Sequence, residues 1–75
     1  MKIGSLMMIG NYSPIYHDGW VRGEMPHTTK GNVIGVVVGS KLEGGILENP
    51  RTFLKVITSE KIGWINSQFC REVYN

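Results

Sequence analysis

Cysteine, proline and long apolar runs are scarce in this sequence of 75 residues. The single cysteine, Cys70, excludes an internal disulfide bond, on which small secreted domains commonly depend. No stretch has the length and apolarity of a signal peptide or a membrane span. We therefore expect a cytoplasmic protein that makes no contact with a membrane.

Runs of charge of one sign are also missing. The 8 lysines and arginines exceed the 6 acidic residues by a net charge of +2, and they are spread along the chain with no run of three. Nonspecific phosphate binding needs a much denser positive charge. A nucleic-acid-binding surface would therefore have to be assembled by folding.

Glycine, in contrast, is abundant, with 10 residues, and the hydrophobic content of 41% is typical of a globular domain. The chain has the length of one domain, residues 1–75, which buries only about 60% of the surface that the unfolded chain exposes. Its β-branched residues occur in short runs between glycines. This pattern predicts an all-β fold of short strands joined by tight turns.

Five segments have the composition of strands, namely residues 2–9, 32–39, 52–58, 62–65 and 70–74. The second is β-branched almost throughout, which predicts a central position, and Gly35 within it predicts a bend or a bulge. Residues 67–69 are expected to form one helical turn before the last strand.

Two connections are long. Residues 10–32 contain Pro14, Pro26 and several glycines, which exclude a helix. We expect a folded-over hairpin whose arms pair weakly around residues 16–22, because a structureless loop of this length is uncommon in a compact domain. Residues 41–50 are predicted to be a polar loop.

The segment Gly-Trp-Ile-Asn-Ser-Gln-Phe at residues 63–69 is the most informative part of the chain. Period-two alternation places Ile65 in the core, and Trp64 and Asn66 on the opposite face. The segment resembles the closing motif of Src-homology-3-like (SH3-like) barrels, Gly-aromatic-aliphatic-Pro-Ser-Asn-Tyr. Positions that agree in kind are Gly63, Trp64, Ile65, Ser67 and Phe69.

This resemblance implies an all-β, five-stranded SH3-like barrel with a long first loop, the RT loop, and a single helical turn before the last strand. The order of the predicted elements agrees with that of the family. The main alternative is an oligonucleotide-binding barrel, which also has five strands but usually longer ones.

The resemblance also implies a binding face. Peptide-binding members of the family hold a polyproline II ligand in an aromatic groove. By position, Trp64 matches an aromatic of that groove, Asn66 its proline and Phe69 its tyrosine, and Tyr12 and Tyr16 are candidates for the loop aromatics. The chain departs from the pattern at Asn66 and at residues 51–53, which contain no tryptophan, and both departures argue against a proline-rich ligand.

Each aromatic also has a purely structural interpretation. Trp64 can pack against the long loop, and Phe69 is expected to fill the end of the barrel. Trp20 either anchors the long loop or belongs to an exposed binding patch.

Residues with catalytic or metal-binding chemistry are present but not patterned. His17 and Asp18 are adjacent, while His27 and Cys70 are distant in sequence and lack the paired spacing of a metal site. A domain of this size offers little room for a water-excluding pocket. We expect no enzyme activity, no cofactor, no bound metal and no small-molecule substrate, with Cys70 pointing into the core.

The sequence therefore favours a non-catalytic protein-interaction module, in the style of small accessory proteins of bacteria and their viruses. The predicted partner-binding residues are Tyr12, Tyr16, Trp20, Trp64, Asn66 and Phe69.

Two alternatives remain open. One is a self-assembling structural subunit. The other is nucleic-acid binding, since residues 30–37 weakly resemble the KOW motif of small barrels in transcription and ribosomal proteins. Basic side chains that cluster would favour nucleic acid, and interleaved acidic ones would favour protein. The candidate nucleic-acid contacts are Arg22, Lys41, Arg51 and Lys55.

Overall fold

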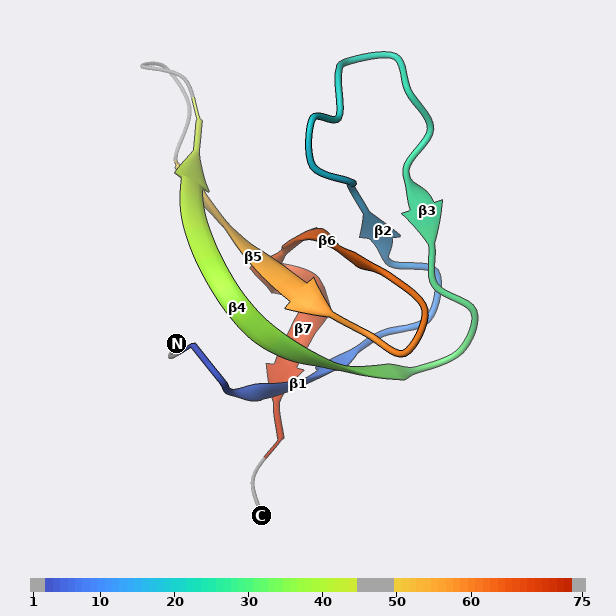
Figure 1. The fold of residues 1–75 in the computed structure, drawn as a ribbon, viewed down its shortest axis with the longest axis vertical. Helices are drawn as coiled ribbons and strands as arrows, with labels where there is room; N and C mark the ends of the chain where they lie inside the picture. Colours follow the sequence, from blue (N-terminus) through green and yellow to red (C-terminus); the bar gives the residue numbers. More distant parts are fainter. Residues whose placement is uncertain (1–2, 45–49, 74–75) are drawn as a thin grey trace.

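Strands dominate the computed structural model, which describes residues 3–44 and 50–73 (Figure 1). Five of them form one antiparallel sheet in the order β6-β5-β4-β1-β7, and β2 and β3 pair separately. The one helical element described is a 3-10 turn, η1, at Ser67–Phe69. The all-β prediction is confirmed. The strands are β1 Leu6–Ile9, β2 Pro14–Ile15, β3 His27–Thr28, β4 Val33–Glu43, β5 Arg51–Ile57, β6 Ile62–Asn66 and β7 Cys70–Glu72.

The two edge strands of the sheet, β6 and β7, are consecutive in the chain and are joined only by η1. The sheet must therefore curl, because its opposite edges meet across a three-residue turn. The long β4 bends accordingly (Figure 1). Its register with β5 shifts between Val37 and Gly39, which is the signature of a β-bulge.

The core lies on one face of this curled sheet. Side chains alternate between the two faces along each strand, and this alternation decides which residues are in the core. In β5, for example, Leu54 and Val56 are fully buried and Lys55 between them is not. Ile65 of β6 is also fully buried, as predicted. The buried apolar residues are Met7, Ile9, Ile15, Val37, Leu54, Val56 and Ile65.

The bulge predicted at Gly35 lies elsewhere in β4, and Gly35 itself is a site of close packing. A Cβ atom at this position would lie 3.2 Å from Cδ1 of Ile9 and 3.4 Å from Cβ of Val56. The absence of a side chain thus lets two core residues approach the strand. The bulge lies further along β4, between Val37 and Gly39.

The predicted loop at residues 41–50 is partly wrong. Lys41 and Glu43 belong to β4 and pair with Phe53 and Arg51 of β5. Polar composition suggested a loop, but these residues extend beyond the register of β1, so the strand has no core to cover there. We call residues 39–43 with residues 51–55 the arm. Residues 45–49 of the predicted loop lie outside the described residues.

Residues 10–32, here called the excursion, fold over on themselves as predicted. The two halves of the excursion pair at Pro14 with Thr28 and at Ile15 with His27, rather than around residues 16–22. Buried hydroxyl groups hold the base together, since Ser13 Oγ and Thr29 Oγ1 both donate to the Gly10 carbonyl at 2.7 Å.

A pair of backbone hydrogen bonds attaches the excursion to the edge strand β6. Tyr16 N donates to Trp64 O at 2.8 Å, and Trp64 N donates to Tyr16 O at 2.7 Å. This reciprocal bridge, together with the burial of Ile15 in the core, fixes the excursion across β6.

Candidate functional site

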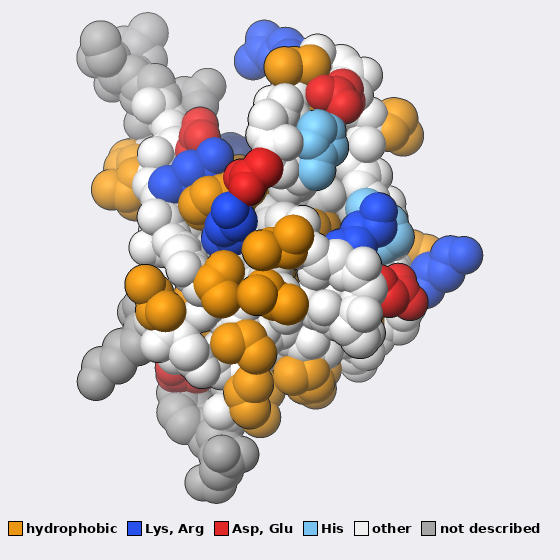
Figure 2. Space-filling model, in the orientation of Figure 1, with side chains coloured by type: hydrophobic (Ala, Val, Ile, Leu, Met, Phe, Trp, Pro, Cys, Tyr) orange, Lys and Arg blue, Asp and Glu red, His pale blue; other side chains and the backbone are white. Residues whose placement is uncertain are grey.

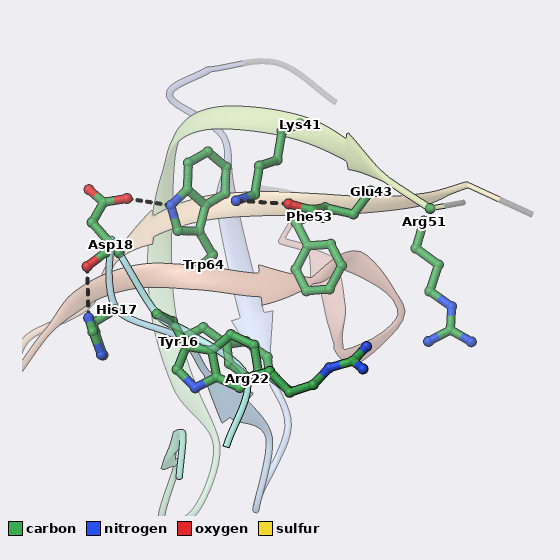
Figure 3. A pocket seen from close by; sticks show the side chains of 12 residues that line it. Tyr16, His17, Asp18, Arg22, Lys41, Glu43, Arg51, Phe53 and Trp64 are labelled. Atoms are coloured by element: carbon green, nitrogen blue, oxygen red, sulfur yellow. Dashed lines mark hydrogen bonds and ion pairs between the residues drawn. The ribbon is translucent and has the colours of Figure 1, made fainter. Parts of the chain in front are cut away.

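A groove of about 690 Å³ lies between the excursion and the arm (Figure 3). Trp64 of β6 lies between the two walls, because it is bridged to Tyr16 on one side and paired with Lys55 on the other. The groove thus joins segments that are far apart in the sequence. Its lining residues are Tyr16, His17, Asp18, Gly19, Trp20, Arg22, Lys41, Glu43, Gly44, Arg51, Phe53 and Trp64.

Trp64 is held on both its edge and its face. Its Nε1 donates to Oδ1 of Asp18 at 2.6 Å, and the Lys41 ammonium lies 4.4 Å from the ring centroid (Figure 3). Lys55 lies 5.7 Å from the same centroid and pairs with Oδ2 of Asp18 at 2.6 Å. The indole is therefore packed against the excursion.

These contacts change the acidity of Asp18. Hydrogen bonds from Lys55 and then from Trp64 favour the carboxylate and hold the pKa of Asp18 below its ordinary value. Asp18 is thus ionised, and its charge is balanced by Lys55. Through these contacts it fixes this part of the excursion against Trp64.

Three aromatic rings, two from the excursion and one from the arm, form what we call the aromatic wall of the groove. Tyr16 meets Trp20 edge to face, with centroids 4.8 Å apart, and also Phe53, at 6.3 Å. Trp20 Nε1 donates to the Glu24 carbonyl at 3.0 Å, so Trp20 is held within the excursion while it lines the groove.

Phe53 was missed by sequence reasoning, which looked for a tryptophan at residues 51–53. The signal was present, because Phe53 is the aromatic residue of that stretch and faces the groove from the arm.

The predicted basic residues gather at this same groove. Arg22, Lys41 and Arg51 line it, and Lys55 lies beside Trp64. Acidic side chains are interleaved with them, as Figure 2 shows in the hollow between the arm and the excursion. Lys41 pairs with Glu43 at 3.1 Å. The aromatic patch and the basic cluster, treated as alternatives in the sequence, are one surface.

Three predicted contact residues do not line the groove. Tyr12 is 73% exposed and has a left-handed backbone conformation, with φ of 59°. Asn66 is on the face predicted for it, opposite Phe53 in register, but only 8% of it is exposed. Its Oδ1 accepts a hydrogen bond from Gln68 N at 3.1 Å, which makes it the cap of η1 rather than a contact residue.

The predicted core position of Phe69 is wrong, because 39% of it is exposed. The chain leaves η1 at this residue, and the next one, Cys70, packs against the core instead. Burial raises the pKa of the Cys70 thiol to about 11, so the group stays protonated and apolar in character at neutral pH.

His17 does not form a dyad with the carboxylate of Asp18. Its Nδ1 contacts the Asp18 carbonyl at 2.7 Å, and its Nε2 contacts Oε2 of Glu24 at 2.9 Å. Both ring nitrogens thus face acceptors, which only the protonated ring satisfies with two donors. The Glu24 hydrogen bond is the main cause that raises the pKa of His17 above 6.5.

The His17 titration provides a direct test of this loop structure. We expect the ring proton signals in nuclear magnetic resonance (NMR) spectra to titrate with a midpoint above 6.5, and Glu24→Gln to move the midpoint toward 6.5. Since the folded pKa is raised, the stabilisation is fully present below the unfolded pKa and is lost as the pH rises through the folded pKa. Glu60→Gln, in the distant turn before β6, is the control. An unchanged midpoint in Glu24→Gln would contradict the pairing.

Within residues 3–44 and 50–73, no three His, Cys, Asp or Glu side chains lie close enough together to hold a metal ion. The same described residues contain no helix long and apolar enough to cross a bilayer.

Comparison with known proteins leaves the groove itself as the basis for a functional proposal. The chain matches no protein-family model, no curated protein and no solved structure.

Proposed function

We propose that the protein is a non-catalytic interaction module with an SH3-like barrel, which binds a segment of a protein partner in the groove. The barrel assignment is supported by the order of elements. A long excursion follows β1, and a single 3-10 turn joins the edge strands β6 and β7. The segment that resembles the closing motif, residues 63–69, falls on β6 and η1.

The aromatic wall is the observation that carries the proposal. Tyr16, Trp20 and Phe53 line one open groove, and aromatic residues are the usual anchors of protein interfaces. Grooves of this kind accept extended peptides, which present side chains to the rings. The indole of Trp64 is covered by Lys41, so the groove does not offer it as a stacking surface for a polyproline helix.

Nucleic-acid binding is the second candidate, and the gathering of Arg22, Lys41, Arg51 and Lys55 is the observation that favours it. It ranks second because half of these cations are already paired with carboxylates. The interleaved acids would also repel a phosphate backbone.

Self-assembly is the third candidate. Leu6, Ile57 and Ile62 are exposed and lie in one cross-strand row through Val36 on the outer face of the sheet. An apolar row of this kind is a common feature of interfaces, but nothing in the structure specifies what covers it.

Two phenylalanines allow a matched test of the groove. Peptides are selected from a displayed library of random dodecapeptides on the immobilised full chain, and binding of the tightest is measured by fluorescence anisotropy. We expect Phe53→Ala to weaken binding about tenfold or more, because an aromatic anchor at an interface commonly contributes at least ~2 kcal/mol.

Phe69→Ala, which removes an exposed aromatic outside the groove, should leave the affinity unchanged. Chemical shifts of the backbone amides verify that both variants are folded. Equal losses in the two variants, or a library that yields no binding peptide, would overturn the proposal.

A further inference from the structure

We infer that the partner segment is acidic, and that Arg22 and Arg51 bind one carboxylate each, or share one, while an apolar neighbour packs on Phe53 and Tyr16. This inference rests on the proposed function and specifies the ligand chemistry of the same groove.

Within the described residues, two of the cations at the groove have no carboxylate partner. Lys41 is paired with Glu43, and Lys55 is paired with Asp18. Arg22 and Arg51 make no ion pair with any residue in the described part of the chain. Among the described residues that line the groove, these two arginines are therefore the cations free to meet ligand carboxylates.

The two guanidinium groups face the same end of the groove (Figure 3). Arg22 extends from the excursion and Arg51 from the start of β5, so they belong to opposite walls. Phe53 lines the same groove from the arm. An extended peptide that crosses this end would place an apolar side chain on the rings and an adjacent acidic one between the arginines.

Arginine is well suited to this task. Its planar guanidinium group donates two parallel hydrogen bonds to a carboxylate and loses its hydration more readily than lysine does. The two free cations in the groove are both arginines, whereas the two lysines are used within the chain.

The same charge count argues against other ligands. A basic peptide would find the carboxylates of Asp18 and Glu43 already occupied by lysines. A nucleic-acid strand presents a phosphate at every nucleotide, whereas the described part of the groove offers two uncompensated cations against it. The two positive charges of Arg22 and Arg51 match a short peptide with one or two acidic side chains.

The test compares selections from the same dodecapeptide library on the unmodified protein and on the Arg22→Gln/Arg51→Gln variant. We expect Asp and Glu to be enriched in the first set and not in the second. The tightest acidic peptide should bind about tenfold more weakly to each single variant, and about a hundredfold more weakly to the double variant if the two losses add. Arg71→Gln, on β7 and outside the groove, is the matched control and should bind like the unmodified protein.

The outcomes separate the two proposals. Peptides that bind in the groove without acidic enrichment, or that tolerate both arginine replacements, would overturn the acidic ligand and leave the interaction module intact. Failure to select any peptide would remove the interaction module and this inference together. A labelled oligothymidylate that binds at about 0.15 M salt, with a log-log salt slope steeper than about −3, would replace both with nucleic-acid binding.

Discussion

Replacing Ile65 by alanine should lower the free energy of unfolding by about 2–5 kcal/mol, the usual range for a fully buried isoleucine. Ile65 has no exposed surface and lies opposite Leu54 of β5, another fully buried residue. Truncation leaves a cavity that backbone hydrogen bonds on β5 prevent from collapsing. Urea denaturation followed by circular dichroism measures the loss as a lower midpoint with an unchanged slope.

Ile62→Ala provides the control, since it makes the same chemical change on the same strand. Ile62 is 53% exposed, so its replacement should cost less than about 1 kcal/mol. A domain of this size has little stability to spare, and Ile65→Ala should be partly unfolded at 37 °C. Equal losses at the two positions would show that the faces of β6 are assigned wrongly.

The sequence predicted those features that depend on local pattern. The alternation around Ile65, the turn at residues 67–69 and the hairpin of β5 and β6 all follow from side-chain periodicity or turn residues within a few positions. The excursion was predicted from glycine and proline content, which excludes a helix but does not determine where the two halves of the excursion pair.

The arm shows why the rest could not be predicted. Strand signals rest on half-buried apolar faces. Lys41 and Glu43 have no core beneath them and hold their strand geometry through backbone pairing with residues about ten positions later. A polar, glycine-bounded stretch that pairs in this way has the same composition as a loop.

The groove is a product of tertiary structure in the same sense. Tyr16, Phe53 and Trp64 meet because the excursion crosses β6 and the arm extends past the core. Their types suggested a binding surface, but which of the aromatics would share it depended on this crossing. Asn66 illustrates the limit, since alternation placed it on the correct face and the following turn then buried it.

Gly63→Ala should detach the excursion from the sheet. A Cβ atom at Gly63 would lie 2.6 Å from Cγ2 of Ile15 and 2.9 Å from the carbonyl oxygen of Tyr16. Neither atom can move away easily, because Cγ2 is fixed to a buried β-branched carbon and the carbonyl oxygen accepts the Trp64 amide bond. The added methyl group must therefore push Ile15 out of the core or break the bridge between Tyr16 and Trp64.

We expect this one methyl group to cost about 3 kcal/mol, the upper part of the range for overpacked sites, since a backbone atom is involved. Gly10→Ala is the matched control, because its Cβ would meet nothing closer than 3.6 Å and it too lacks a positive φ.

Hydrogen exchange at the Tyr16 and Trp64 amides should accelerate in Gly63→Ala more than exchange in β1 and β4. Because the aromatic wall depends on the same bridge, peptide binding should fall together with amide protection. A variant that retains both would show that the excursion is not held at this point, and that the contacts of Asp18 with Lys55 and Trp64 hold the wall of the groove instead.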